Sequence, residues 1–525
     1  MSEAGGDRQR APGPAPAERP WRLALAVGLI SAAVLAFEVS LMRMLLVASW
    51  HHFTFLVISI ALLGFGASGT ALSLARSWLL PRGDGALTGL SVATFVSMPV
   101  AALVAQHVPV EARLAPAELW LQIANWVLLF AVLAVPFLLG AAAIGLGLML
   151  AGDRAGVVYA GNLVGSAVGA LAANGLMWFV PPAWLPIVAA GAALAAIPAG
   201  RWQPLRTRVA VSVAAVAAVV LALGVEPPRV RLDPFKYRAH VARLERQGAA
   251  RRLAVRYSPR STVELFRGDA FHEMAFLSPD ARPPRLDVLT TDGHWAGSML
   301  RPDGGGRGRT ADQTLMGVGY DLLGRRPRVA LLGEVGGTNA WLAAHHDADA
   351  IHVVQPDRRI VELWRERPDG AAFIDLPGVR VHVAEPRQFV DRAPTQFELV
   401  HVVSLESLAA GSGGVAGLAE NHLVTVKGMA ACIECLAPDG LLMVCRGIQT
   451  PPRDNLKLLA TLVRAMQRLG IDEPARHTVI VRDYLGVCTL VKRTPWTDGQ
   501  VARVRATCHR RNLTPVWFRG IRPGE

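Results

Sequence analysis

The chain has 525 residues, of which 52% are hydrophobic, and its mean hydropathy is +0.33. This composition excludes an ordinary soluble protein and indicates membrane-spanning segments. The formal net charge of +13 is compatible with nucleic acid, anionic lipid or cytoplasmic loops, and the five cysteines show no disulfide framework.

The first part of the chain is predicted to be a membrane domain. Residues 1–20 are rich in Pro, Ala, Gly and Arg and are expected to form a disordered basic tail. Residues 21–225 follow as a transmembrane domain of about seven helices, since their apolar stretches have about the length that a bilayer requires. The predicted spans cover residues 23–47, 53–75, 86–107, 120–150, 156–180, 184–199 and 207–224. We therefore expect a multi-pass membrane protein. The abundance of Arg, Ala and Gly is typical of a GC-rich bacterial genome, so the expected location is a bacterial inner membrane.

Arginine placement predicts the orientation of these spans. Basic residues precede the first span and follow the second, fourth and sixth, so the positive-inside rule places the N-terminus in the cytoplasm. Seven spans would put the C-terminal domain outside, whereas a cytosolic nucleotide cofactor would require six or eight. The side of this domain therefore stays open. Because the arginines follow the membrane loops, nucleic-acid binding is not expected.

Two features lie inside the predicted spans. Glu38 and Arg43 share the first span, where charges are costly, and a structural ion pair is favoured over a transport pathway. Gly161, Gly165 and Gly169 form two overlapping GxxxG motifs in the fifth. Small residues at this spacing predict two closely packed helices.

Beyond residue 225 the composition becomes that of a soluble domain. Residues 226–310 form a predicted β-rich portion, because the runs TVELF, EMAFL and LDVLTTDG are consistent with antiparallel strands. Residues 311–525 alternate strand and helix patterns and predict a Rossmann-like α/β domain. Near its end we expect an antiparallel pair, 478–482 with 487–491, and a last helix capped by Thr497.

The α/β domain is organised around residues 328–357. An apolar run, 329–332, is followed by Gly333, Gly336 and Gly337, a helical segment, and a second apolar run, 351–354. This pattern predicts the first βαβ unit of a doubly wound sheet, with the 329–332 strand central and buried. The glycines would either let the backbone approach a nucleotide or only form a tight turn.

Ligands of such sheets bind at the carboxyl ends of the strands. This rule predicts one crevice surrounded by polar side chains that follow the strands, namely Glu334, Gln355, Glu385, Ser404 and Glu406. A glycine-rich stretch, 411–417, is expected to be a gate over it. Cys432 and Cys435 form a lone CxxC on a predicted helix, and no second pair lies nearby, so no metal site is predicted.

Five segments follow one another in a recognisable order: PRVALLGEVGGTNAWLA, HVVQPDRRIVEL, VHVAEPRQFV, QFELVHV and LAENHLVTVKGMAACIECLAPDGLL. In this order they resemble the spermidine synthase family, and more closely its bacterial membrane-attached relatives. The resemblance implies a multi-span N-terminal part and a C-terminal domain with the class I methyltransferase fold. It also implies transfer of an aminopropyl group from decarboxylated S-adenosylmethionine to an amine. S-adenosylmethionine itself is the alternative cofactor.

The resemblance also implies roles for individual residues. The cofactor-binding set would be Gly333, Glu334, Gly336, Gly337, Gln355, Asp357 and Glu385, and the catalytic pair would be Glu406 and Ser404. The chain departs from the family in three places. Val335 stands in the glycine turn, the acid that binds the ribose aligns with Val353, and the catalytic Asp aligns near Val403 or Ser404.

These departures leave open whether the chain is an enzyme. We expect a membrane-anchored spermidine synthase-like protein with an eroded, non-catalytic or divergent site. The first alternative is an active aminopropyltransferase or S-adenosylmethionine-dependent transferase of polyamine metabolism, and the second is a transporter-like membrane protein. The expected partners are the membrane, an adenosyl ligand and a polyamine, while a homo-oligomer stays open.

Overall fold

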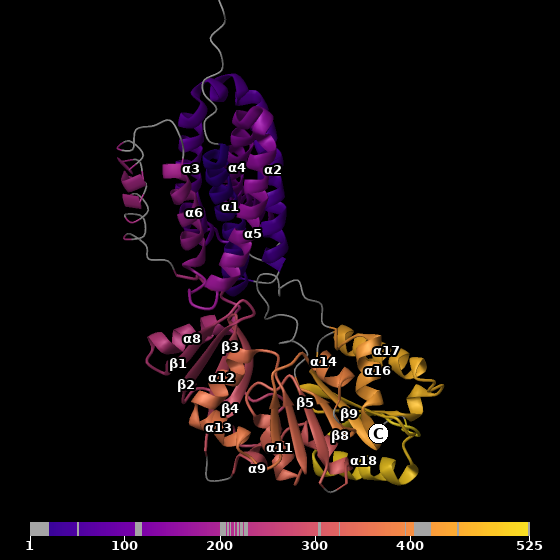
Figure 1. Ribbon diagram of the computed structural model, residues 1–525. Helices are drawn as coiled ribbons and strands as arrows, with labels where there is room; N and C mark the ends of the chain where they lie inside the picture. Colours follow the sequence, from indigo (N-terminus) through magenta and orange to yellow (C-terminus); the bar gives the residue numbers. More distant parts are fainter. Residues whose placement is uncertain are drawn as a thin grey trace, which may run out of the picture. The chain divides into compact units, whose positions relative to one another are not determined.

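The computed structural model describes residues 20–49, 52–110, 118–199, 229–302, 306–324, 326–393, 395–403, 422–448 and 451–522, with scattered residues between 206 and 224. The chain separates into two compact units, Met1–Arg231 and Leu232–Glu525. Figure 1 shows the first unit as a helical bundle and the second as sheets covered by helices. The division falls a few residues beyond the predicted boundary at 225/226.

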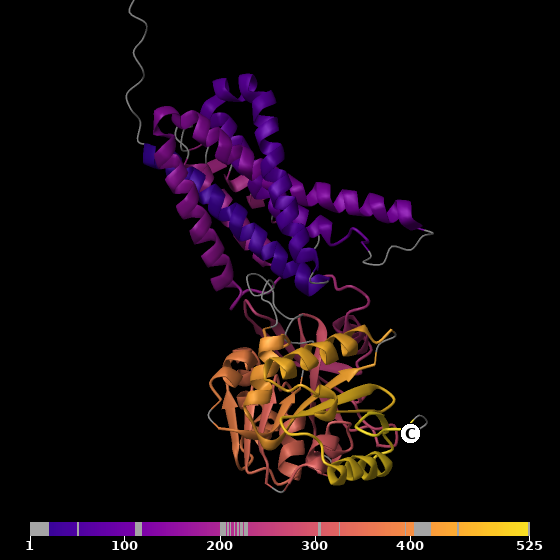
Figure 2. The same ribbon diagram turned by 90° about the vertical axis from the view of Figure 1, so that its right-hand side faces the viewer.

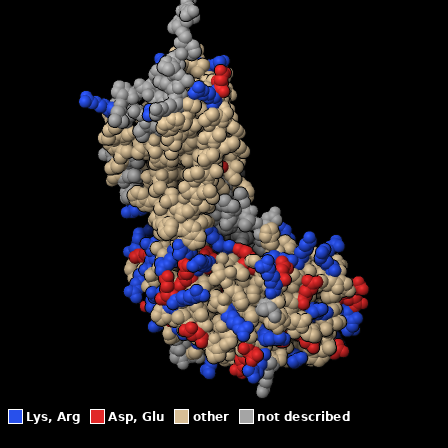
Figure 3. All heavy atoms as spheres, in the orientation of Figure 1, with Lys and Arg blue, Asp and Glu red and all other residues tan. Residues whose placement is uncertain are grey.

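The helical unit is arranged around its first helix. Its described helices are α1 (Pro20–Ala48), α2 (His52–Leu79), α3 (Gly83–Ala105), α4 (Leu119–Ala151), α5 (Ala155–Leu176) and α6 (Leu185–Ala199). α1 packs against α2, α4, α5 and α6, so most of its side chains are buried, including Arg43. The other helices surround it (Figure 2). The visible outer face of this unit carries almost no charged side chain along the helices, as a surface that faces lipid requires (Figure 3).

Within the part of the chain that the structure describes, four helical stretches are long and apolar enough to cross a membrane. They are Pro20–Ala48, Phe55–Arg82, Gly85–Ala105 and Leu119–Leu176. The last has 58 residues and comprises α4 and α5, which the single turn Gly152–Arg154 separates at a positive φ of Gly152. α6 has 15 residues, fewer than the roughly 20 that a perpendicular span requires. The predicted span 207–224 lies mostly outside the described residues, so the prediction of seven spans is supported only in part.

The glycine stripe of α5 packs directly on α1. A Cβ atom added at residue 161, 165 or 169 would lie 2.5, 2.0 or 2.2 Å from a backbone oxygen of α1. The three facing oxygens belong to Ala24, Gly28 and Ala32, which are also small and also spaced by four. The Ser31 hydroxyl donates a hydrogen bond of 2.6 Å to Asn162 Oδ1 across the same interface. The predicted close packing is therefore confirmed, with α1 as the partner.

The C-terminal unit begins with helix α8 (Tyr237–Arg246) and a four-stranded antiparallel sheet. Its strands are β1 (Ala250–Tyr257), β2 (Thr262–Gly268), β3 (Leu286–Thr291) and β4 (His294–Leu300), paired in chain order. TVELF and LDVLTTDG lie in strands as predicted. EMAFL does not, because residues 273–277 form an irregular connection with one isolated bridge, Leu277 to Thr314. Its apolar side chains face a pocket and the core instead of a strand partner.

The second sheet has eight strands in the order β12-β10-β11-β9-β8-β5-β6-β7. They are β5 (Arg328–Leu332), β6 (Ala350–Val354), β7 (Val379–His382), β8 (Phe397–Val402), β9 (Leu436–Gly447), β10 (Thr478–Arg482), β11 (Gly486–Lys492) and β12 (Thr514–Trp517). The five strands from β7 to β9 are parallel, and the others are antiparallel. Since β5 is followed by β6 on one side and neighbours β8 on the other, the switch point of this Rossmann-like sheet lies between β5 and β8.

Helices cover both faces of this sheet, as the sequence pattern predicted. They are α9 (Arg307–Asp312), α10 (Gly317–Leu322), α11 (Thr338–His345), α12 (Arg358–Glu366), α13 (Pro368–Ile374), α14 (Pro386–Asp391), α16 (Val426–Glu434), α17 (Arg453–Arg468) and α18 (Asp498–Arg510). Val329 and Leu331 of β5 pack in one apolar core and Ala330 and Leu332 in the other. The central strand is thus buried on both faces. Thr497 caps α18 with Gln500 in a capping box.

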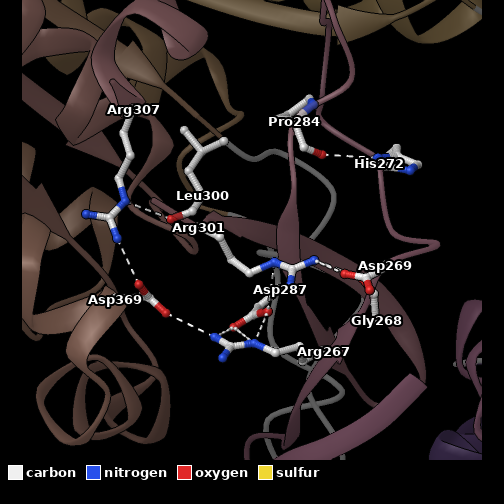
Figure 4. Close-up of polar contacts among 10 residues, drawn as sticks. All are labelled: Arg267, Gly268, Asp269, His272, Pro284, Asp287, Leu300, Arg301, Arg307 and Asp369. Carbon is white, nitrogen blue, oxygen red and sulfur yellow. Dashed lines mark hydrogen bonds and ion pairs between the residues drawn. The ribbon is translucent and has the colours of Figure 1, made fainter. Parts of the chain in front are cut away.

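An ion-pair network joins the four-stranded sheet to helices α9 and α13 (Figure 4). Arg267 of β2 bonds Asp287 of β3 at 2.6 Å and Asp369 of α13 at 3.1 Å. Asp369 also pairs with Arg307 of α9 at 2.8 Å. The hydrogen bonds that Arg267 donates to the carboxylate of Asp287 are the main reason that the pKa of Arg267 is raised. The network holds the four-stranded sheet against α9 and α13.

Candidate functional site

A pocket of about 360 Å³ lies at the switch point of the large sheet. Three strand ends contribute to it: Glu334 to Gly336 after β5, Val403 after β8, and Cys445 to Gly447 of β9. The four-stranded sheet and its connection close the other side with Met274, Ala275, Phe276 and Trp295 to Ser298. This is the position in which doubly wound sheets bind ligands, and the volume lies within the range of ligand pockets.

The carboxylate of Glu334 fills the glycine turn. Its Oε1 accepts hydrogen bonds from the backbone N–H groups of Val335, Gly336 and Gly337 at 3.0, 3.0 and 2.8 Å. Its Oε2 accepts from the backbone and side-chain nitrogens of Asn339 at 3.2 and 2.9 Å. Glu334 is only 2% exposed. Consecutive N–H groups of this kind form an anion-binding nest, and in this chain the anion is a side chain of the turn itself.

The glycines of the turn each have a local structural reason. Gly333 and Gly337 have φ values of +86° and +78°, which other residues rarely adopt. A Cβ atom at Gly336 would lie 2.0 Å from the backbone oxygen of Ser298 in β4. Gly336 therefore allows the turn to contact a strand of the other sheet. The sequence alone had left open whether a nucleotide approaches the backbone here or the glycines only form a tight turn.

Neither Gln355 nor Asp357 is among the residues that line the pocket. Gln355 Nε2 donates to the backbone oxygen of Glu334 at 2.6 Å, and its Oε1 accepts from the backbone N–H of Asp357 at 2.8 Å. Asp357 caps α12 by accepting from the N–H of Arg359 at 2.8 Å, and it also bonds the hydroxyl of Ser261. Burial raises the pKa of Asp357, although these two donors oppose the shift.

The predicted alignment of the ribose acid with Val353 needs correction. Val353 lies within β6 and is fully buried in the core, whereas the acid is expected after the second strand. The first residue past β6 is Gln355, which is therefore the matching position. Glu385 lies at the surface of the domain. It pairs with Arg260 at 2.6 Å with half of its side chain exposed, and it is not among the residues that line the pocket.

The predicted catalytic residues cannot be placed. Ser404, Glu406 and the predicted gate 411–417 lie outside the described residues, while Val403, which precedes them, lines the pocket. Of the predicted cofactor-binding set, only Glu334 and Gly336 contribute to the pocket wall.

Sequence reasoning missed much of the pocket wall. Trp295 and Phe276 provide aromatic surface, and Arg446 contributes a guanidinium that also bonds Asp454. The first two come from the four-stranded portion, about forty or more residues before the turn, and no spacing in the sequence links them to it. Arg446 directly precedes the end of β9, so the strand-end rule could have identified it. Burial and the nearby Glu334 carboxylate raise the pKa of Tyr320, which lies beside the turn.

Metal binding finds no support in this part of the molecule. Among the described residues, no group of three or more His, Cys, Asp or Glu side chains is arranged to hold a metal ion. Cys432 and Cys435 are both free, and the sulfur of Cys435 bonds the backbone oxygen of Cys432.

Sequence comparisons identify no relative: no protein-family model matches the chain, and no curated protein matches it significantly. Among solved structures, the neighbours include spermidine synthases and methyltransferases. A spermidine synthase in complex with the transition-state analogue AdoDATO has 17% identity and a TM-score of 0.32, over 48% of this chain and 76% of that one. Spermidine synthase from Thermotoga maritima has 15% identity and a TM-score of 0.32, over 48% and 75%. Human methyltransferase-like protein 13 in complex with SAH has 15% identity and a TM-score of 0.28, over 37% and 89%.

Proposed function

We propose that this chain is a membrane-anchored, divergent relative of the spermidine synthases whose C-terminal domain does not transfer aminopropyl groups. In this view the domain serves as a sensor or assembly module for the helical unit. The proposal rests on one observation, namely that the Glu334 carboxylate takes up the N–H groups of the glycine turn.

The energetic argument starts from the five hydrogen bonds that Glu334 accepts. A hydrogen bond to a charged group contributes roughly 1.5–3 kcal/mol, so a ligand that needs these N–H groups must displace a well-stabilised buried carboxylate. Gln355 adds a second obstacle, because both ends of its amide are already hydrogen-bonded to backbone groups, those of Glu334 and Asp357. The residues present therefore do not fit an adenosyl ligand held by the turn and by an acid after β6.

The charge of the pocket argues against a diamine acceptor. Among the described lining residues, Glu334 is the only carboxylate and Arg446 the only guanidinium. A diamine is cationic and requires acidic partners that can also accept a proton. Glu334 is already engaged, and Arg446 would repel the ammonium groups.

An active transferase is the second candidate function. The position of the pocket at the switch point and its volume of about 360 Å³ favour it. Ser404 and Glu406 would have to supply the chemistry in that case.

Ligand binding to the full-length protein in detergent separates the two candidates. We expect S-adenosylmethionine, its decarboxylated form and methylthioadenosine to show no saturable binding below about 1 mM, that is, a binding free energy weaker than about −4 kcal/mol. Micromolar binding of any of them would overturn the proposal.

The double variant Glu334→Ala with Gln355→Glu should gain at least about tenfold in affinity for these ligands, since it frees the N–H groups and restores an acid. The matched control is Glu473→Ala, which changes an exposed ion pair elsewhere in the domain.

The membrane part of the proposal has its own test. Arginine placement with seven spans predicts that the C-terminal domain lies outside the cytoplasm. Alkaline phosphatase fused after Gly224 should then be active. Fluorescence of a cytosol-only reporter fused at the same position would show that the C-terminal domain lies in the cytoplasm.

A further inference from the structure

Three buried thiols gather where the last strands meet the final helix. Cys445 of β9 is 5% exposed, Cys488 of β11 is fully buried, and Cys508 of α18 is 4% exposed. Cys445 and Cys488 are directly opposite each other in the antiparallel pairing of β9 with β11. All three are free thiols, and the function proposed above uses none of them.

The pairing pattern places Cys445 and Cys488 at a close position. The backbone N–H of Ile448 donates to the oxygen of Leu485 at 2.8 Å, which marks this opposed pair as hydrogen-bonded. Because such pairs alternate along an antiparallel ladder, the pair three residues away, Cys445 with Cys488, is not hydrogen-bonded. In pairs of this kind the Cα atoms are about 4.5 Å apart, which lies within the range of about 4.4–6.8 Å that disulfides span.

The side chains of the two residues lie on the same face of the sheet, because residues directly opposite each other in an antiparallel pair point to the same side. Burial raises the pKa of the Cys488 thiol well above its usual value, and the neighbouring Cys445 thiol raises it further. The register of the two strands therefore brings the thiols next to each other.

Only one of the two thiols faces the pocket. Cys445 lines the cavity of about 360 Å³, whereas Cys488 is not among its lining residues. A small reagent that enters the pocket therefore meets Cys445 first. This order assigns Cys445 as the attacking thiol and Cys488 as the resolving thiol.

We propose that Cys445 and Cys488 form a modification site in which a small organic disulfide, R–S–S–R, oxidises them to an intramolecular disulfide bond. First, Cys445 loses its proton and its sulfur attacks one sulfur of the reagent, so that the R–S–S–R bond breaks and a mixed disulfide forms at Cys445. The released thiolate takes up the proton and leaves as R–SH. Next, Cys488 loses its proton and attacks the Cys445 sulfur, and a second R–SH leaves. Two protein thiols are oxidised and one reagent disulfide is reduced, so atoms and electrons balance.

The bond would change the pocket wall. It would fix β9 to β11 immediately before Arg446 and Gly447, which line the same cavity. A disulfide also restricts the unfolded chain between the joined residues, so the oxidised protein should unfold at a higher temperature than the reduced protein.

Cys432 and Cys435 provide an internal control within the same domain. They lie three residues apart in the segment of α16, and the Cys435 sulfur bonds the backbone oxygen of Cys432 at 3.2 Å instead of the other sulfur. Burial raises the pKa of Cys435 to about 12, and neither residue lines the pocket. The structure therefore predicts that this pair resists the reagent that oxidises Cys445 and Cys488.

The test uses the full-length protein in detergent, treated with cystamine, then denatured, alkylated and digested without reduction. We expect one linked peptide pair, Cys445 with Cys488, while Cys432, Cys435 and Cys508 are alkylated. A persistent mixed disulfide on Cys445, a link from Cys488 to Cys508, or a link from Cys432 to Cys435 would each overturn the assignment. This mapping of the unsubstituted protein decides the matter even where a variant fails to fold.

Variants and pH then test the order of the two steps. Cys488→Ser should stop at the mixed disulfide, Cys445→Ser should leave Cys488 unmodified, and Cys508→Ser and Cys435→Ser should leave the bond intact. Because the thiolate is the nucleophile, closure of the mixed disulfide should accelerate about tenfold per pH unit below the pKa of Cys488. A closure rate independent of pH would contradict Cys488 as the resolving thiol.

Discussion

Glycine brings two backbones into contact in two regions of the molecule, and the regions differ in what the sequence reveals. Between α1 and α5, the stripe Gly161, Gly165 and Gly169 lies against backbone oxygens of another helix. In the turn after β5, Gly336 lies against the backbone oxygen of Ser298 in another sheet. The helical stripe repeats every four residues and so predicts its use, whereas a glycine turn looks the same whether a nucleotide or a strand approaches it.

The largest expected effect comes from Gly165→Ala in α5. The added Cβ atom would lie 2.0 Å from the backbone oxygen of Gly28, and a backbone cannot rotate away as a side chain can. We expect a loss of about 3 kcal/mol or more, at the upper end of overpacking effects. The measurement is the thermal unfolding midpoint in detergent. Gly156→Ala, in the same helix with nothing within 4 Å, is the matched control and should change little.

Gly336→Ala tests the close contact between two backbones in the glycine turn. Its Cβ atom would also lie 2.0 Å from a backbone oxygen, but an end of a strand and a turn can adjust more than two packed helices. The expected loss is about 2–3 kcal/mol. The control is Gly447→Ala, whose nearest neighbour would be 4.0 Å away. If both variants unfold at the same midpoint, the contact with Ser298 is not what requires glycine at this position.

Glu334→Gln tests how much the carboxylate contributes to the stability of the turn. The substitution keeps the shape, but its –NH₂ group would face either the three turn N–H groups or the two nitrogens of Asn339, which are all donors. We expect a loss of about 2 kcal/mol, the range for hydrogen bonds to a charged group. Chemical denaturation measures it. An unchanged midpoint would show that water or a rearranged turn replaces these bonds.

The smallest effect concerns a buried polar group that lacks such partners. His401 of β8 is fully buried, neither of its ring nitrogens has a partner in the described part of the chain, and burial lowers its pKa to about 3. The unfolded chain binds this proton near pH 6.5, so stability should fall as the pH drops from about 6.5 toward 3. The loss at pH 5.5 is about 1.4 kcal/mol. His401→Leu should reduce the slope of the unfolding free energy against pH by the equivalent of one proton. An unchanged slope would show that another group takes up the proton.

The sequence predicted those features that repeat along the chain. Short apolar runs predicted the β5–β6 unit and the antiparallel pair of β10 with β11, and the residue type of Thr497 predicted the helix cap. Residues 273–277 were wrongly predicted to be a strand. Apolar side chains of this segment line a pocket and do not face a strand partner. Alignment by similarity also placed the ribose acid within β6, where Val353 faces the core.

The site itself was harder to predict, for a physical reason. Glu334 could be recognised as a residue at a strand end, but its hydrogen bonds depend on how the turn folds back over it. Trp295 and Phe276 reach the pocket from another sheet, so their proximity is a property of the tertiary structure. Gln355 was selected as a ligand for the cofactor, yet its amide is satisfied within the protein.

The contact between Gly336 and Ser298 bears on the order in which the chain can fold. Ser298 belongs to the first half of the C-terminal unit and is synthesised before the glycine turn, so the turn meets a partner that has already left the ribosome. One apolar core also runs through both halves, with Leu265 and Val288 in the first and Val329 in the second. A fragment that starts at residue 311 would expose its share of that core and leave the turn without its supporting strand. Residues 232–310 therefore act as an intramolecular template for the Rossmann-like sheet, and cutting the chain at 310 should abolish folding of both fragments rather than yield two smaller domains.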